Sequence, residues 1–221
     1  MENADLPGRL SQVPFHGPLS QARAARLTER LTRNHPGTVL DIGCGWGELM
    51  LRILAAVPDA TGVGTTRGPA DLVLCVGASH SLSDVQPPGQ TAAALTALRR
   101  LVTPGGRVLL GEGFWQRPPT AAELAAMWPG TTAGELLDLA QIADLAVAAG
   151  FRPAWIETAT EAEWEEFESG YQADEEEWLA AHPDHPEAAE IRQRLDEHRS
   201  YWLRGYRGLL GLAYLTLIPV G

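Results

Sequence analysis

An apolar run that ends in three alternating glycines constrains the fold of this chain more than any other feature. Residues 38–42 are mostly β-branched or aliphatic, and Gly43, Gly45 and Gly47 follow them. Residues 48–56 then carry apolar side chains at helical spacing. Because glycine has no Cβ and tolerates a positive φ, a ligand can lie against the bare backbone of such a turn. The pattern predicts a strand, a tight ligand-holding turn and a helix.

Apolar runs of strand length alternate with helical patterns along the rest of the chain. This alternation predicts an α/β fold, a three-layer arrangement in which helices cover both faces of a mostly parallel sheet. A short helical stretch should follow Thr120. We expect strands at residues 38–42, 60–63, 71–76, 107–110, 151–158 and 209–218, and helices at residues 21–33, 48–56, 91–102, 136–149, 161–181 and 187–204.

The length of 221 residues, with 45% hydrophobic residues, is enough to bury one substantial core. We therefore expect a single domain over residues 1–221. Residues 1–36 should form a helical lead-in to that domain. Residues 159–207 should form a helical insert, or lid, before the last strand.

The charge of the chain excludes several kinds of function. The formal net charge is -11, and all 17 basic residues are arginine. A chain without lysine cannot use a Schiff-base lysine or a phosphate-loop lysine. Its negative charge would repel a phosphate backbone, so we expect no nucleic-acid partner. Residues 153–190 hold 13 acidic residues and no arginine, which is typical of a solvated helical face.

The sequence also indicates no targeting segment and no metal site. The first residues lack the basic and apolar regions of a signal peptide, and the apolar stretch at residues 209–220 is too short to span a bilayer. We expect a cytoplasmic protein without membrane contact. Cys44 and Cys75 have no CxxC partner, and His182 and His185 have no evident third ligand, so we expect no bound metal. The sequence does not indicate an oligomeric state.

The spacing and charge of the glycine turn select among ligands. A dinucleotide-binding turn has the spacing G-x-G-x-x-G, but here Glu48 stands three residues after Gly45 and would point an anion toward a pyrophosphate. The turn therefore disfavours a dinucleotide, and with it an NAD-dependent dehydrogenase. S-adenosylmethionine carries a sulfonium and an ammonium and no phosphate. Acidic side chains beside the turn, Asp41 and Glu48, suit it electrostatically.

Asp41-x-Gly43-x-Gly45-x-Gly47 after an apolar strand resembles the first motif of class I S-adenosylmethionine-dependent methyltransferases. The resemblance covers most of residues 20–158 and includes a strand at residues 70–81 that ends at the reaction centre and a Pro-Gly-Gly turn at residues 104–106. It implies a Rossmann-like sheet of seven strands whose last strand, residues 209–218, is antiparallel. It also implies S-adenosylmethionine as cofactor and S-adenosylhomocysteine as product, held by Asp41, Gly43, Cys44, Gly45, Trp46, Val76 and Gly77.

One segment of the family pattern is missing. Family members have, after the second strand, an acidic residue that binds the ribose, then a helix and a third strand. Only residues 65–69 separate the second strand from the next apolar run here, which is too short for a helix and a strand. Either a segment is absent from the sequence record, the explanation that we prefer, or the deletion is genuine. A chain break between Val63 and Ala70 would support the first.

Methyl transfer from a sulfonium is an in-line displacement, so the enzyme mainly aligns the acceptor and, where needed, removes a proton. His80, after the run at residues 71–76, is a candidate general base, with a structural loop histidine as the alternative. Glu112 and Trp115 follow the next predicted strand at the edge where α/β sheets bind ligands. His80, Glu112 and Trp115 are therefore candidate substrate contacts. Gly77-Ala78-Ser79-His80 lacks the motif of adenine and glutamine N-methyltransferases, which disfavours those acceptors.

Aromatic residues of the insert follow one helical stripe, Trp164, Phe167, Tyr171 and Trp178. The stripe favours packing onto the domain, and the alternative is a lid over an apolar acceptor, which makes Trp164 and Tyr171 further candidates for substrate contact. The sequence favours methylation of a small-molecule acceptor. The alternative is a catalytically silent cofactor-binding or interaction protein on the same fold.

Overall fold

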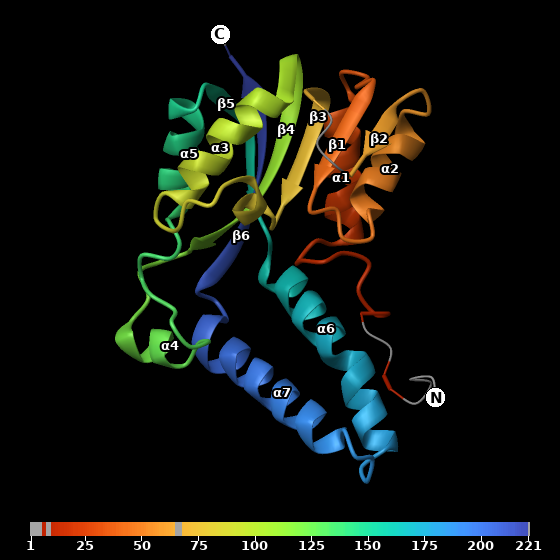
Figure 1. Cartoon of the computed structure of the whole chain (residues 1–221), viewed down its shortest axis with the longest axis vertical. Coiled ribbons are helices and arrows are strands. Elements are labelled where there is room, and N and C mark those ends of the chain that lie inside the picture. The colour runs from red at the N-terminus through yellow and green to blue at the C-terminus, as the bar shows by residue number, and fades with distance from the viewer. Residues whose placement is uncertain (1–5, 8–9, 65–67, 221) are drawn as a thin grey trace.

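A computed structural model describes residues 6–7, 10–64 and 68–220 of the chain. Its described part contains a six-stranded sheet with the order β2-β1-β3-β4-β6-β5. Figure 1 shows the sheet with helices on both sides and two long helices extending from one end. The strands are β1 (Thr38–Ile42), β2 (Thr61–Val63), β3 (Ala70–Val76), β4 (Val102–Trp115), β5 (Phe151–Thr158) and β6 (Leu210–Pro219).

The sheet is parallel except at β6. β1 pairs in parallel with β2 and β3, and β3 pairs in parallel with β4, whereas β6 is antiparallel to both of its neighbours, β4 and β5. The predicted turn at residues 104–106 lies within β4 as a bulge, between the pairs Ala70–Val102 and Leu72–Arg107. The predicted α/β class, with its antiparallel last strand, is confirmed.

Two hydrophobic clusters hold helices on opposite faces of the sheet. On one face, α1 (Gln21–Thr32) and α2 (Glu48–Ala56) pack on side chains that include Leu74, Leu109 and Tyr214. On the other face, α3 (Gln90–Leu101) and α5 (Leu139–Ala148) pack on the alternate side chains, such as Leu110. Because strand side chains alternate between faces, this division produces the three layers.

β4 and β6 extend beyond the rest of the sheet. The last pair between β3 and β4 is Val76–Gly111, but β4 continues to pair with β6 as far as Trp115–Leu210. This ribbon projects past the carboxyl ends of β1 and β3. It forms one wall of the space where open α/β sheets bind ligands.

The insert consists of α6 (Glu161–Ala181), α7 (Ala188–Ser200) and a π-helix, η2 (Tyr201–Tyr206). In Figure 1, α6 and α7 form a V that is closed at residues 182–187 and opens toward the sheet. The short helix α4 (Ala121–Ala125) lies near the open end, and the 3-10 helix η1 (Ser79–Leu82) follows β3. No described helix combines the length and apolar composition needed to cross a bilayer.

The structure corrects several expectations. Six strands are present in the described residues where the resemblance implied seven, because the connection from β2 to β3 is too short to hold another helix and strand. The predicted helix at residues 187–204 is α-helical only to Ser200 and continues as the π-helix. Helix α5 begins at Leu139, where Asp138 caps it, and not at residue 136. The possible chain break concerns residues 65–67, which lie outside the described residues.

Candidate cofactor site

The glycine turn between β1 and α2 has the backbone conformation that the sequence predicts. Gly43, Gly45 and Gly47 all have positive φ, at 71°, 54° and 79°. A Cβ on Gly43 would lie 2.3 Å from the Cβ of Ala78, and a Cβ on Gly45 would lie 2.8 Å from Cδ2 of His16. The turn closes with a hydrogen bond that the backbone N–H of Gly47 donates to the carbonyl of Cys44, 2.7 Å away. Both conformation and space therefore require glycine at positions 43 and 45.

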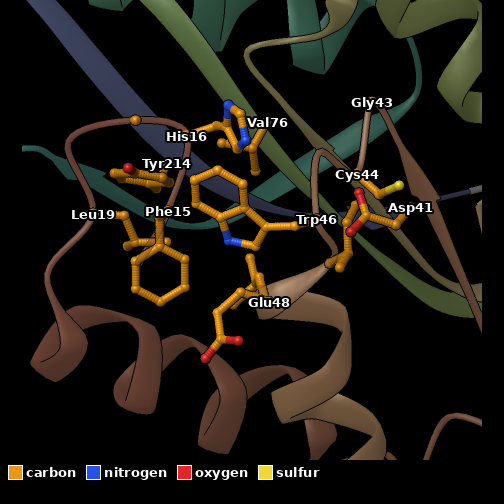
Figure 2. Close-up of a pocket in the computed structure, with 13 residues that line it drawn as sticks. Phe15, His16, Leu19, Asp41, Gly43, Cys44, Trp46, Glu48, Val76 and Tyr214 are labelled. Atoms are coloured by element: carbon orange, nitrogen blue, oxygen red, sulfur yellow. The ribbon is translucent and has the colours of Figure 1, made fainter. Parts of the chain in front are cut away.

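A pocket of about 520 Å³ opens beside this turn, on the face of the sheet that α1 and α2 cover. In Figure 2 the Trp46 indole lies between the aromatic rings of Phe15 and Tyr214 on one side and Asp41 on the other. The pocket thus combines a bare backbone turn, the buried carboxylate of Asp41 and aromatic side chains. Its lining residues are Phe15, His16, Gly17, Leu19, Asp41, Gly43, Cys44, Trp46, Glu48, Leu49, Leu74, Val76 and Tyr214.

Asp41 is the buried acidic group of the pocket. Its side chain comes from β1 just before the turn, and the residue is 7% exposed. Among the described residues, none donates a hydrogen bond to its carboxylate. Burial raises the pKa of Asp41 to about 6. A buried carboxylate without a partner is costly, so this position favours a ligand with a positive charge. Glu48 also lines the pocket, but Nε of Arg52 already pairs with it at 2.7 Å.

The segment before α1 covers the glycine turn. Nε1 of Trp46 donates a hydrogen bond to the carbonyl of Pro14 at 2.8 Å, and the rings of His16 and Trp46 lie 3.8 Å apart between centroids. Phe15 and Leu19 are buried in the same cluster as Leu49 of α2. This covering segment shields one side of the pocket from water.

Tyr214 closes the pocket from β6. Its hydroxyl donates a hydrogen bond to the carbonyl of Pro18 at 3.1 Å, and burial raises the pKa of Tyr214. The sequence analysis did not select Phe15, Leu19, Leu49, Leu74 or Tyr214, which reach the pocket through tertiary packing. The one available signal was a tyrosine inside an otherwise aliphatic strand pattern.

The residues predicted to bind the cofactor lie close together. Asp41, Gly43, Cys44, Trp46 and Val76 line the pocket, and Gly45 belongs to the same turn. Gly77 follows Val76 at the end of β3, where its N–H donates a hydrogen bond to the carbonyl of Gly111 at 2.9 Å. It has positive φ, and no atom lies within 4 Å of where a Cβ would be. Their role in binding stays a prediction.

The candidates on the acceptor side are more dispersed. His80 is exposed on η1. Glu112 is buried under it and accepts hydrogen bonds from the hydroxyls of Ser79, at 3.0 Å, and Thr91, at 3.1 Å. Burial raises the pKa of Glu112 although these hydrogen bonds and His80 oppose the change. The arrangement shows Glu112 fixing η1, and thereby the position of His80, by way of Ser79.

Trp115, Trp164 and Tyr171 lie outside the pocket beside the glycine turn. Trp115 is buried, and its Nε1 donates a hydrogen bond to the carbonyl of Ala133 at 3.0 Å. Trp164 is half-buried between the cluster under α1 and the cluster around Trp115. Tyr171 is exposed on α6 and stacks on His198 with 5.3 Å between ring centroids. These three residues do not share one pocket with His80.

The described residues contain no group of three or more His, Cys, Asp or Glu side chains arranged to hold a metal ion. His182 and His185, the pair singled out in the sequence, both pack against the ring of Trp178. Both cysteines are free, and burial raises the pKa of Cys75 to about 12.

Both the amino-acid sequence and the fold match known proteins. Residues 19–154 match the family described as Methyltransferase domain. An uncharacterised protein of Escherichia coli, YjhP, is 25% identical over 243 residues, which cover 94% of this chain and 95% of YjhP. Because 243 exceeds the 221 residues of this chain, YjhP has residues within the aligned stretch that this chain lacks.

Two solved structures share the fold at a sequence identity that supports the fold alone. An S-adenosylmethionine-dependent methyltransferase from Thiobacillus denitrificans, in complex with S-adenosylhomocysteine, has a TM-score of 0.75, 22% identity and 94% coverage of both chains. One from Geobacter sulfurreducens, in the same kind of complex, has a TM-score of 0.76, 21% identity, and coverage of 97% of this chain and 99% of its own. With a family match over more than half of its length, this chain belongs to the methyltransferase-domain family, and it has the Rossmann-like fold of class I S-adenosylmethionine-dependent methyltransferases.

Proposed function

We propose that this protein transfers a methyl group from S-adenosylmethionine to a small-molecule acceptor by direct in-line displacement. The buried Asp41 carboxylate beside the glycine turn is the observation that carries the proposal. It offers a negative charge without a partner to a ligand with an ammonium and a sulfonium. The positive-φ glycines offer backbone at close range, where a side chain would collide.

The residues of the pocket fit this cofactor. The Asp41 carboxylate would hold the ammonium, the turn from Gly43 to Gly47 would carry the methionine part, and Phe15 and Tyr214 would exclude water. S-adenosylmethionine supplies an activated methyl group on its sulfonium, so the protein contributes alignment more than reactive groups. The covering segment from Pro14 to Leu19 must hold the pocket closed while the acceptor approaches.

On the acceptor side, His80 is the proposed general base. It stands on η1, four residues after the pocket residue Val76 at the end of β3, and is exposed to solvent. Ser79 and Glu112 fix the backbone of η1 through a buried hydrogen bond. An exposed imidazole can accept a proton from an acceptor hydroxyl or amine and pass it to water. The helical insert at residues 159–207 is proposed to bind the rest of the acceptor.

Calorimetric titration with S-adenosylhomocysteine tests the cofactor assignment, with NAD⁺ as the matched negative control. We expect a single site for S-adenosylhomocysteine and no binding of NAD⁺, because no glycine spacing for a pyrophosphate is present. Absence of S-adenosylhomocysteine binding, or binding of NAD⁺, would contradict the proposal.

The short connection from β2 to β3 favours a second candidate, a catalytically silent cofactor-binding or interaction protein. β2 is only three residues long and lies at the edge of the sheet, and the connection after it is too short for the ribose-binding segment that the family resemblance implies. Turnover separates the two candidates. If S-adenosylhomocysteine binds, but S-adenosylmethionine is not consumed with any amine, hydroxyl or thiol acceptor offered, the silent protein is the better account.

A further inference from the structure

A second cavity, of about 510 Å³, lies where α6 and the π-helix η2 diverge below the sheet. Three aromatic residues line it, Trp164 from α6 and Trp202 and Tyr206 from η2, together with Leu210 of β6. In Figure 1 the start of α6 and the end of α7 lie at the open end of the V. The cavity is built mostly by the insert, outside the glycine-turn pocket.

The second cavity faces the same side of the sheet as the first. Tyr214 lines the first pocket and Leu210 the second, and both belong to β6. Side chains four residues apart on a strand point to one face and are separated by roughly 13 Å, at about 3.3 Å per residue. The two cavities therefore lie on one face of β6, with Leu212 and Trp164 packed between them.

The aromatic rings form much of the apolar lining of the cavity. The hydroxyl of Tyr206 donates a hydrogen bond at 2.8 Å to Glu168, which does not line the cavity, and Nε1 of Trp164 is buried without a hydrogen-bond partner among the described residues. The π-helix carries Trp202 and Tyr206 on one side, with the Arg207 N–H donating to the carbonyl of Trp202 at 2.9 Å. π-Helical turns are rare and concentrate at functional sites.

The charged rim is negative. Arg207 pairs with both Glu161, at 2.7 Å, and Glu165, at 2.6 Å, so two carboxylates face one guanidinium. Both belong to the segment at residues 153–190 that holds 13 acidic residues and no arginine. Such a potential concentrates cations and repels anions. The negative faces of aromatic rings attract cations in the same way.

We infer that this aromatic cavity, formed by Trp164, Trp202 and Tyr206, binds an organic ammonium, the positively charged end of the methyl acceptor. The inference rests on the proposed function only in naming the bound cation as the acceptor. The group that receives the methyl is then at the opposite end of the acceptor from its ammonium, near His80.

Choline and its uncharged carbon isostere, 3,3-dimethylbutan-1-ol, form the matched pair of probes. The indole N–H signals of the seven tryptophans report binding by NMR, and Trp164→Phe and Trp202→Phe identify the two cavity signals. We expect choline to shift both signals and to bind roughly tenfold more tightly than the isostere. Equal affinity of the two probes, or shifts confined to other tryptophans, would overturn the inference.

Arg207→Gln gives a test whose sign depends on the charge of the ligand. Arg207 is exposed, so its replacement should leave the fold intact, and freeing two carboxylates should strengthen choline binding by roughly threefold. Glu161→Gln/Glu165→Gln should weaken it by a similar factor. Trp202→Leu should reduce choline binding by roughly three- to tenfold. Weaker choline binding to Arg207→Gln would refute a cation site.

Titration of the same protein with S-adenosylhomocysteine separates the two proposals. If S-adenosylhomocysteine binds and choline does not, the cation site is wrong and the proposed function stands. If choline binds and S-adenosylhomocysteine does not, the cation site stands and the proposed function is wrong.

Discussion

At the scale of single residues, the ionised carboxylate of Asp41 should lower the stability of the protein without ligand and strengthen the binding of a cationic ligand. Burial raises its pKa from 3.8 to about 6, so the folded protein holds this proton more tightly than the unfolded chain does. Folding stability must then fall as the pH rises through the interval from 3.8 to about 6. A shift of this size corresponds to roughly 3 kcal/mol of stability that the ionised carboxylate removes from the protein without ligand.

Asp41→Asn should therefore be more stable than the natural protein at pH 7, by up to roughly 3 kcal/mol, and equally stable below pH 3.8. Urea unfolding at several pH values measures this difference. The contributions of the other carboxylates to the pH dependence of stability cancel, because both proteins contain them. The same variant should bind S-adenosylhomocysteine at least about tenfold more weakly, since it lacks the charge for the ammonium. A variant that is less stable at pH 7 but binds normally would show that Asp41 has a structural role only.

Ligand binding near pH 6 should also release a proton from Asp41. A bound ammonium favours the ionised carboxylate, so the pKa of Asp41 should fall on binding. Calorimetry in two buffers with different ionisation enthalpies measures the proton released. We expect release at pH 6 that disappears at pH 8, where Asp41 is already ionised, and is absent in Asp41→Asn at both pH values.

Gly43 allows a steric prediction with a matched control. Gly43 and Gly105 have similar positive φ, 71° and 81°, but only at Gly43 would a Cβ meet another atom, Cβ of Ala78 at 2.3 Å. Gly105→Ala should cost about 1 kcal/mol from backbone conformation alone. Gly43→Ala should cost clearly more and abolish cofactor binding. Thermal unfolding and titration with S-adenosylhomocysteine measure both, and equal costs would show that the contact with Ala78 relaxes freely.

At the scale of elements, Glu163 joins two helix starts. It accepts hydrogen bonds from the backbone N–H and hydroxyl of Ser20, which caps α1, and of Thr160, which caps α6. Nε and Nη2 of the buried Arg23 also donate to it. Burial alone would raise the pKa of Glu163, but these hydrogen bonds outweigh it and hold the pKa at about 2. The insert is thereby fixed to the helix that follows the covering segment.

Glu163→Gln should destabilise the protein by roughly 3 kcal/mol at pH 7, because it leaves the buried Arg23 without its main partner. The folded pKa lies below the ordinary value of 4.5, so this stability exists above pH 4.5 and is lost as the pH falls toward 2. The difference from the natural protein should shrink over that interval. Glu166→Gln, exposed on the same helix, is the control and should be neutral within about 0.5 kcal/mol in urea unfolding.

Elements with strong local signals could be predicted from the sequence, and elements shaped by tertiary packing could not. The bounds of β1, α2, β5 and α6 agree with the predicted ranges, because apolar periodicity and capping residues such as Thr160 define them locally. The extension of β4 to Trp115 depends on pairing with β6, more than 90 residues later. The π-helix after Ser200 likewise depends on packing, here of Gly205 against Met127.

The same distinction holds within the cofactor site. Asp41 and the glycines stand in one continuous motif, so the sequence could identify them. Phe15 and Tyr214 come from opposite ends of the chain, and only the folded sheet brings both to the turn. Glu112 was expected at a ligand-facing edge, but its position on β4 directs it to Ser79 and Thr91 beneath η1.

At the scale of the whole molecule, net charge and the two pockets suggest how ligands approach. The protein carries a net charge of -11, with acidic residues concentrated on α6 beside the covering segment. The backbone N–H and the hydroxyl of Ser11, just before the covering segment, donate hydrogen bonds to Asp174 of α6 at 2.7 and 2.5 Å. A cationic cofactor and a cationic acceptor would both be drawn toward this side.

This field predicts how salt distinguishes the cofactor from its product. S-adenosylmethionine has a net positive charge, whereas S-adenosylhomocysteine is neutral overall and otherwise alike. Raising the salt from about 0.01 M to about 1 M shortens the screening length from about 30 Å to about 3 Å. S-adenosylmethionine should lose affinity over this range, while S-adenosylhomocysteine should change little. Calorimetry at each salt concentration measures both, and Asp41→Asn should keep part of the difference, because the long-range charge of α6 remains. Parallel changes for the two ligands would mean that the acidic surface does not contribute to cofactor binding.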